Sequence, residues 1–164
     1  MNETIIANWN VKVGTSDLVY HLGDFGMGQK DQWPKFRSRL PGKIILVRGN
    51  HDKGAQYMRD VVGMDEVYDS LYIELDGVKV YMSHRPERGD LPQEVSYRLA
   101  GHVHSLWERQ GSLINVGMDV SGLVPLTFEE LLARDSPEVY TKCYICGETL
   151  DGFRCPNKHD YGRY

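Results

Sequence analysis

The first half of the chain alternates between two hydrophobic patterns, one typical of helices and one typical of buried strands. Three segments carry apolar side chains at helical spacing and predict helices, namely 2–13, 30–40 and 55–61. Two continuous apolar runs predict strands buried on both faces, namely 18–22 and 43–47. Each run breaks into a glycine and then polar residues, so the carboxyl ends of these strands are the expected place for chemistry.

The second half of the chain is richer in strands. Asp76-Gly77 lies between two apolar runs and is the strongest short signal for a β-hairpin. Short strands are expected at 71–75, 78–83, 95–99, near Trp107, and at 112–116. Thr127 and Glu130 form a capping-box pattern that opens a last helix over 127–132. Together these elements predict a mixed α/β domain with two sheets and outer helices.

Length and composition are those of one ordinary globular domain with a short appendage. The 164 residues are 41% hydrophobic and 26% charged, which is typical of a chain with a single packed core. The net charge of −4 provides no basic field for non-specific binding of nucleic acid. No apolar run reaches the roughly 20 residues of a membrane span. We find no signal-peptide pattern, so the expected location is the cytoplasm.

Basic residues between positions 35 and 48 leave two interpretations open. They are Lys35, Arg37, Arg39, Lys43 and Arg48. Such a cluster either attracts an anionic substrate or forms a solvated helix face.

Gly101-His102-Val103-His104 places two histidines one residue apart after an apolar run. Alternate residues of a strand point the same way, so both imidazoles are expected to leave one face of a strand together. The glycine before them permits close approach of another backbone or of an ion. Two satisfied histidines with a packing role are the alternative.

Polar residues at the predicted strand ends combine carboxylate, amide and imidazole groups. They are Asp24, Asn50, His51, His84, His102 and His104. This ligand set suits manganese, iron, nickel or zinc, and it lacks the thiolates of a purely structural zinc centre. One carboxylate can bridge two ions ~3.5–4 Å apart, the spacing used for phosphoryl chemistry. The sequence therefore predicts a site for one or two divalent ions.

Four motifs in order resemble those of the calcineurin-like metallophosphoesterase superfamily, and the resemblance covers about residues 2–134. The motifs are Gly23-Asp24, Gly49-Asn50-His51-Asp52, Ser83-His84 and Gly101-His102-Val103-His104. The resemblance implies a four-layer α-β-β-α sandwich of two mixed sheets. It also implies hydrolysis of phosphomonoesters or phosphodiesters at a binuclear metal centre.

The resemblance further implies a role for each matched residue. Asp24 would be the carboxylate that bridges the two ions. One metal site would be completed by Asn50, His84 and His102. His104 would belong to the other site, and His51 would stabilise the developing charge or protonate the leaving oxygen.

The chain departs from the family at its start. Family members begin with a strand that ends in Asp-x-His and supplies two ligands of one metal site, whereas this first strand is missing here. The site of His104 would then keep only His104 and Asp24. Three explanations stay open, namely a one-metal enzyme, a true start upstream of Met1, and a domain that is no longer an enzyme. Loss of a central strand would also favour a homo-oligomer that covers the exposed sheet.

Several other polar residues have competing interpretations. Arg85, directly after a predicted ligand, either binds a phosphate oxygen with two hydrogen bonds or is a plain surface arginine. Asp52 is expected to orient neighbouring backbone or the adjacent histidine. Asn115 and Asp119 either support the site or form a plain turn. His21 is expected to be a satisfied core histidine.

The three cysteines all lie in a C-terminal tail, 137–164, which we separate from the metallophosphoesterase domain at 1–136. Four ligands in the tail have the spacing of a zinc knuckle, namely Cys143, Cys146, Cys155 and His159. A tail this short has almost no core, so bound zinc would supply its folding energy. Reduced free thiols are the alternative.

Two functions from different classes are consistent with these features. The first is a metal-dependent phosphoesterase that acts on a small phosphoester or a nucleotide, with diesters favoured over monoesters. The second is a non-catalytic binding scaffold that keeps the fold, as the retromer scaffold subunit of the same superfamily does. The presence of His51 favours the enzyme, because a scaffold has no use for a leaving-group histidine.

Overall fold

The computed structural model describes residues 2–75, 77–86, 94–134 and 148. The predicted zinc tail lies outside the described residues, including its four ligands Cys143, Cys146, Cys155 and His159. The zinc site and the domain boundary at 136 therefore stay predictions.

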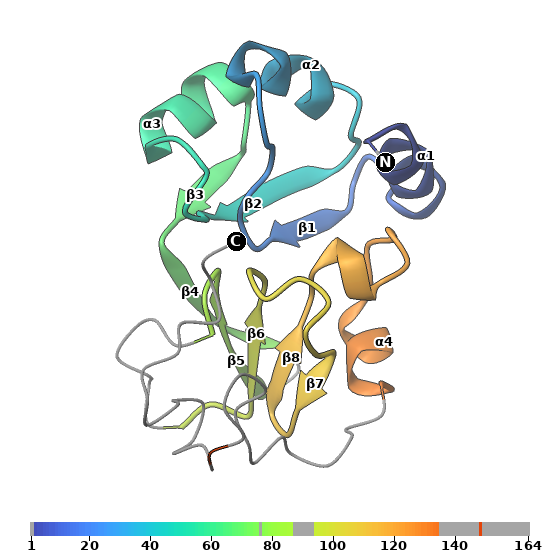
Figure 1. The fold of residues 1–164 in the computed structure, drawn as a ribbon, viewed down its shortest axis with the longest axis vertical. Helices are drawn as coiled ribbons and strands as arrows, with labels where there is room; N and C mark the ends of the chain where they lie inside the picture. The colour runs from blue at the N-terminus through green and yellow to red at the C-terminus, as the bar shows by residue number, and fades with distance from the viewer. Residues whose placement is uncertain (1, 76, 87–93, 135–147, 149–164) are drawn as a thin grey trace.

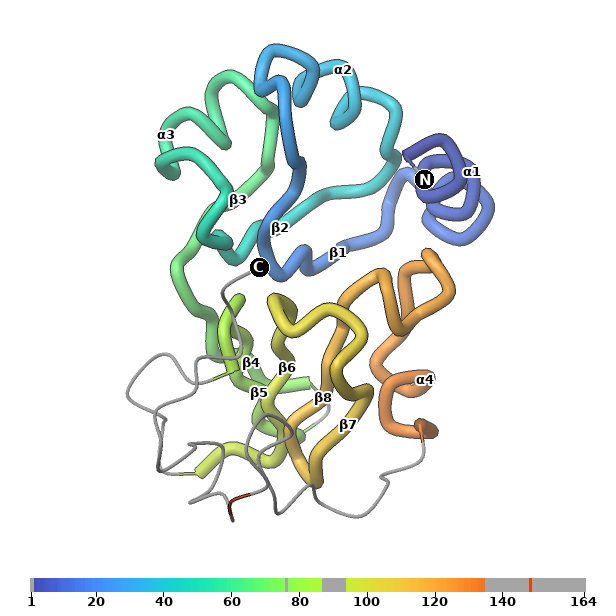
Figure 2. Tube along the Cα trace, viewed as in Figure 1, coloured from blue at the N-terminus to red at the C-terminus, as the bar shows by residue number. Residues whose placement is uncertain are grey.

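Two sheets face each other and form the body of the protein (Figure 1). The first sheet has three parallel strands in the order β1-β2-β3, namely β1 (Leu18–His21), β2 (Lys43–Val47) and β3 (Glu66–Tyr68). The second sheet has the order β4-β5-β6-β8-β7 and mixes parallel with antiparallel pairs. Its strands are β4 (Ser70–Leu75), β5 (Val78–Ser83), β6 (Tyr97–Ala100), β7 (Arg109–Gln110) and β8 (Leu113–Asn115). The chain passes from one sheet to the other between β3 and β4 (Figure 2).

The helices are short and most of them pack on the first sheet. They are α1 (Asn2–Lys12), α2 (Trp33–Arg37), α3 (Ala55–Tyr57) and α4 (Phe128–Leu132). Three single-turn helices complete the fold, namely η1 (Lys30–Gln32), η2 (Met58–Val62) and η3 (Met118–Val120). The predicted mixed α/β architecture with two sheets is confirmed. None of the described helices is long and apolar enough to cross a membrane.

Strand β2 is buried on both faces and divides the core into two clusters. Ile44 and Leu46 point to the outer cluster, where they meet Trp9 of α1 and Trp33 of α2. Val47 points the other way, into the cluster between the sheets. That inner cluster also contains Leu22, Val80, Met82, Leu99, Ile114 and Leu131. The continuous apolar run of β2 therefore follows from its two packed faces.

Two predicted elements differ from the structure for identifiable reasons. The helix expected over 30–40 is η1 followed by α2, which ends at Arg37. The guanidinium of Arg37 binds the carbonyl oxygens of Leu40 (2.7 Å) and Gly42 (3.1 Å), which holds this stretch in a turn. The strand expected near Trp107 is β7, two residues later, because the Asn115 side chain occupies the Trp107 carbonyl at 2.7 Å.

Most side chains of the basic cluster at 35–48 form ion pairs with nearby carboxylates. Three of its arginines pair with carboxylates, namely Arg37 with Asp65, Arg39 with Glu3, and Arg48 with Asp69. These contacts favour the interpretation as a solvated surface over that of a substrate-attracting patch.

Candidate metal centre

Four loops at strand ends carry the predicted ligands to the space between the sheets. Asp24 follows β1 and Asn50 follows β2, so both come from the first sheet. His84 follows β5 and His102 follows β6, so these come from the second sheet. The cluster is therefore assembled from residues that lie far apart in the sequence and from both halves of the sandwich.

The carboxylate of Asp52 joins the two loops of the first sheet. It accepts hydrogen bonds from the backbone N–H groups of Asp24 (2.9 Å), Phe25 (2.9 Å) and Gly49 (2.8 Å). Asp52 thus orients backbone, as the sequence predicted, and its two oxygens are occupied by these three donors. Because its oxygens are used in this way, Asp52 holds the loops instead of facing the cluster.

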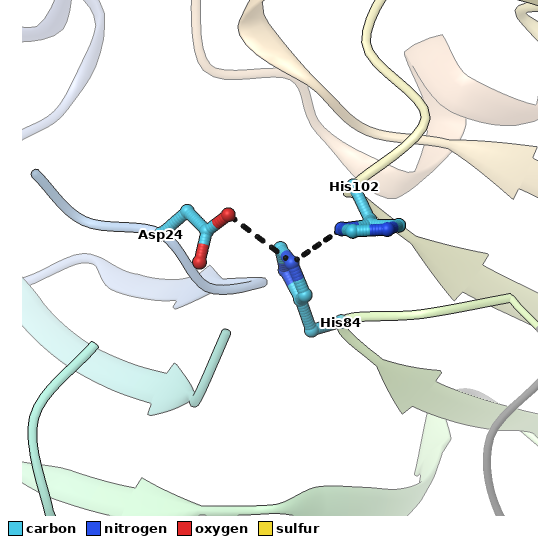
Figure 3. A group of neighbouring side chains, drawn as sticks. All are labelled: Asp24, His84 and His102. Atoms are coloured by element: carbon cyan, nitrogen blue, oxygen red, sulfur yellow. Dashed lines mark hydrogen bonds and ion pairs between the residues drawn. The ribbon is translucent and has the colours of Figure 1, made fainter. Parts of the chain in front are cut away.

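Asp24, His84 and His102 form a compact group in which one ligand atom of each lies within 4.8 Å of the others (Figure 3). His84 is the central member. Its Nε2 lies 3.3 Å from Oδ2 of Asp24, 3.1 Å from Nδ1 of His102 and 3.1 Å from Oδ1 of Asn50. The structure therefore brings together all four residues that the family resemblance assigns to one metal site.

Whether the Nδ1 atom of His84 carries a proton determines what the Asp24, His84 and His102 group can bind. Nδ1 lies 2.8 Å from the carbonyl oxygen of Leu22, and a carbonyl can only accept, so Nδ1 carries the proton. A neutral His84 then presents the lone pair of Nε2 to three other electron-rich atoms. One proton can point at only one of these atoms, whereas a metal ion can accept all the lone pairs at once. The residues therefore fit a divalent cation, and a backbone carbonyl that orients a ligand histidine is a usual feature of such sites.

The protonation states of the ligands also suit a cation near neutral pH. Burial raises the pKa of Asp24, but the contact with the His84 side chain and the hydrogen bond from the His51 backbone outweigh it and lower this pKa to about 2. Burial and the nearby charge of Arg85 lower the pKa of His102 to about 4. Asp24 is therefore ionised and His102 neutral, and these are the forms that bind metals.

Two glycines let the loops approach closely enough to form the centre. A Cβ atom on Gly49 would lie 2.0 Å from Oδ1 of Asp24. A Cβ atom on Gly23 would lie 2.5 Å from Nδ1 of His84, and Gly23 has a φ of +90°. Neither position accepts a larger residue without displacing a ligand.

The two histidines of Gly101-His102-Val103-His104 do not lie on a strand, so that prediction is wrong. Strand β6 ends at Ala100, and the chain then forms a tight turn in which the Val103 N–H donates to Gly101 O at 2.7 Å. His102 has a φ of +66° and His104 a φ of +48°, both in the left-handed region. The two imidazoles therefore do not share a strand face. Among the described residues, the compact ligand group includes His102 but not His104.

His104 instead forms a pair with Asp119. Its Nδ1 lies 2.9 Å from Oδ2 of Asp119, and 76% of its side chain is exposed. The fully buried side chain of Asn115 donates to the carbonyl oxygens of His104 (2.6 Å) and Trp107 (2.7 Å). Asn115 and Asp119 therefore both contact the loop that carries His104, which a plain turn would not require.

The remaining predicted site residues lie around this group. His51 is exposed, and its backbone N–H donates to Oδ1 of Asp24 at 2.9 Å. Arg85 is close enough for its charge to affect His102. His21 is partly buried, accepts a hydrogen bond from the Gly23 N–H at 3.2 Å and packs edge-on against Phe25. The structure is consistent with the interpretation of His21 as a satisfied packing residue.

Sequence reasoning missed one contributor to the centre and left the role of a second open. One is the Leu22 carbonyl, which orients His84, and no side-chain signal could have indicated a backbone oxygen. The other is the amide of Asn115, whose three hydrogen bonds join the chain at His104, Trp107 and Gly117. A polar residue inside the apolar run 112–116 was the available signal for Asn115.

Two facing sheets with a carboxylate, an amide and two imidazoles between their strand ends define an α/β sandwich with a candidate metal centre. Residues 4–118 match the calcineurin-like phosphoesterase superfamily domain, and the chain belongs to that superfamily.

Several known proteins resemble this chain over most of its length. An uncharacterised protein of Methanocaldococcus jannaschii is 30% identical over 79% of this chain and 72% of its own. The gene 66 protein of Mycobacterium phage D29 is 29% identical over 79% of this chain and 81% of its own. The crystal structure of AQ665 from Aquifex aeolicus, a protein of unknown function, has a TM-score of 0.62 and 26% identity. That similarity covers 79% of this chain and 82% of the AQ665 chain.

We predict that Gly49→Ala lowers the affinity for Mn²⁺ by about 10–100-fold, because the new methyl group displaces the Asp24 carboxylate. Titration calorimetry on the purified full chain measures this affinity. The matched control is Gly54→Ala, since a Cβ at Gly54 meets no atom within 4 Å. Wild-type affinity in Gly49→Ala would show that Asp24 does not bind the ion.

We also predict that His104→Gly has a higher free energy of unfolding than His104→Ala. At most positions the alanine variant is the more stable of the two. The left-handed backbone of His104 costs a non-glycine residue about 1–2 kcal/mol, and both variants lose the contact with Asp119 equally. Urea unfolding of His104→Gly and His104→Ala compares their free energies of unfolding. At Lys35, exposed on α2, the order should be the usual one, with glycine worse by about 0.5–1 kcal/mol. Equal stability of the two position-104 variants would rule out the strain.

Proposed function

We propose that this member of the superfamily is a metal-dependent phosphodiesterase whose reaction occurs at the Asp24, His84 and His102 centre. The observation that carries the proposal is the grouping of Asp24 Oδ2 (3.3 Å), Asn50 Oδ1 (3.1 Å) and His102 Nδ1 (3.1 Å) around Nε2 of His84. Manganese, iron, nickel and zinc all suit these ligands. When bound, the divalent cation supplies polarisation of the phosphoryl group and a water of lowered pKa.

Charge at the centre favours a diester over a monoester. Asp24 contributes one negative charge against the two positive charges of a divalent cation, which leaves a net charge of +1 at the centre. A phosphodiester carries one negative charge, whereas a monoester carries between one and two near neutral pH. The cation and Asp24 taken alone therefore match the charge of the diester, and Arg85 adds a further positive charge beside them.

Two side chains beside the centre have proposed roles toward the substrate. His51 is exposed directly after the ligand Asn50, and we assign it the proton donor to the leaving oxygen. Arg85 directly follows the ligand His84, and its charge lies near His102, so we assign it to a phosphoryl oxygen of the substrate. A small phosphoester or a nucleotide would supply both the leaving oxygen and the phosphoryl oxygen.

The proposal predicts that the Mn²⁺-loaded full chain hydrolyses bis(p-nitrophenyl) phosphate faster than p-nitrophenyl phosphate. Asp24→Ala and His84→Ala should abolish turnover. His51→Ala should lower kcat by about 10²–10⁴-fold, because proton transfer is lost. Arg85→Ala should raise KM by about tenfold or more, because a charged hydrogen bond is lost.

The control for these variants is Asp60→Asn, an exposed substitution on η2 that should leave turnover unchanged. A faster monoester reaction would overturn the diester preference. Metal binding without hydrolysis in manganese, iron, nickel or zinc would favour the non-catalytic scaffold.

We further propose that the tail holds one structural zinc through Cys143, Cys146, Cys155 and His159, on the basis of their spacing alone. Metal analysis of the purified protein should then find zinc that Cys143→Ser reduces. The Asp24→Ala variant should keep this zinc, since the two sites share no ligand. Full retention of zinc in Cys143→Ser would exclude the knuckle.

A further inference from the structure

Strand β4 is the longest strand at the border of a sheet in the described part of the chain. It has six residues and forms one border of the second sheet, with β7 at the other border (Figure 1). The other border strands, β1, β3 and β7, are two to four residues long. Because β4 pairs with β5 along its whole length, its own conformation is fixed. Its other edge therefore presents an ordered row of backbone groups to a further strand.

Three residues of β4 direct their backbone N–H and C=O groups to this outer edge. The carbonyl oxygen of Lys79 in β5 accepts the N–H of Ser96 at 2.8 Å, so it points toward β6 and away from β4. Glu74 lies opposite Lys79, and two residues so placed do not exchange backbone hydrogen bonds. The backbone groups of Glu74 therefore face outward. Because these directions alternate along a strand, those of Tyr72 and Ser70 face outward too.

The side chains of β4 also suit the addition of a strand. Ser70, Tyr72 and Glu74 are exposed on one face, and 45% of Tyr72 is accessible to solvent. Leu71 and Ile73 on the other face are only partly buried against the cluster between the sheets. Residues 70–75 contain no lysine or proline, the residue types with which proteins usually block a border strand. A further strand would therefore satisfy backbone groups and bury more apolar surface.

We propose that two copies of this chain pair through antiparallel β4 strands and form a two-fold symmetric dimer with one continuous sheet. The two-fold axis passes beside Tyr72, so the two Tyr72 residues lie opposite each other. Ser70 then lies opposite Glu74 of the second copy, where its hydroxyl can donate to the carboxylate. On the inner face, Leu71 lies opposite Ile73 of the second copy.

The positions of the outward groups select this register. With the axis at Tyr72, each outward residue of β4 meets an outward residue of the second copy. A shift in either direction leaves at least one of them beyond the end of the partner strand, and an axis at Glu74 would also place two carboxylates directly opposite each other, which is unfavourable. A two-fold contact uses the same edge of both copies, so assembly stops at the dimer.

The contact is small, since it joins one strand to one strand, and a monomer–dimer equilibrium that depends on concentration is therefore expected. It involves the second sheet, so it does not depend on the missing first strand of the family. It also does not depend on the proposed phosphoesterase function.

Sedimentation velocity of the full chain over a range of concentrations tests the dimer. The dimer fraction of the wild-type protein should rise with concentration. Tyr72→Lys should be monomeric, because two like charges would face each other at the axis. The matched control is Val11→Lys, which places lysine at a valine that is 90% exposed on α1, on the opposite side of the molecule (Figure 1). This control should dimerise like the wild type.

Four outcomes would overturn the proposal. They are a wild-type protein that is monomeric at every concentration, a dimer that persists in Tyr72→Lys, loss of the dimer in Val11→Lys as well, and growth of the wild-type protein into species larger than a dimer.

Opposite charges at position 70 test the register. Ser70→Lys should tighten the dimer by about 2–30-fold and Ser70→Glu should weaken it by a similar factor, since each dimer contains two pairs of position 70 with Glu74. Both variants keep an exposed side chain at the start of β4. The same two substitutions at Ser16, an exposed turn residue before β1, change the net charge equally and should leave the dimer affinity unchanged. Equal effects of Ser70→Lys and Ser70→Glu, or equal effects at the two positions, would exclude this pairing.

Discussion

The arrangement of the centre depends on the carboxylate of Asp52, which is not one of the predicted metal ligands. Asp52 receives three backbone N–H groups from two different loops, so the ends of β1 and β2 cannot move independently. These hydrogen bonds place the carboxylate of Asp24 against Gly49, so closely that no side chain fits at position 49. Hydrogen bonds from neutral donors to a charged acceptor are stronger than neutral pairs. The positions of Asp24 and Asn50 are therefore set by backbone that the Asp52 side chain holds in place.

Strained backbone also positions residues in both halves of the centre. Among the described residues, four that are not glycine have positive φ, and Asp24, His102 and His104 are three of them. Such conformations persist only where packing and hydrogen bonds determine them fully. Here the anchors are the Leu22 carbonyl on His84 and the buried amide of Asn115 below His104. The strain thus coincides with the residues that carry the chemistry.

Local patterns predicted the strands and the ligand set, but not the geometry of the last motif. Both ends of strand β2 were predicted correctly, because a strand buried on both faces is a continuous apolar run and polar residues follow it directly. The candidate ligands could be selected because each one follows a predicted strand. The turn at His102 could not be read locally, since its apolar and polar alternation is that of a strand. The partner of His104 lies 15 residues away and is decided by tertiary structure.

The four candidate ligands are divided equally between the two sheets, with Asp24 and Asn50 on one and His84 and His102 on the other. An ion bound by all four would cross-link halves of the sandwich that otherwise meet through an apolar cluster. Binding to the native state alone adds about 2.7 kcal/mol of stability when the free ion is at 100 times its Kd. The lifetime of such a protein in the presence of proteases would then depend on metal supply, because the metal-free chain unfolds more often.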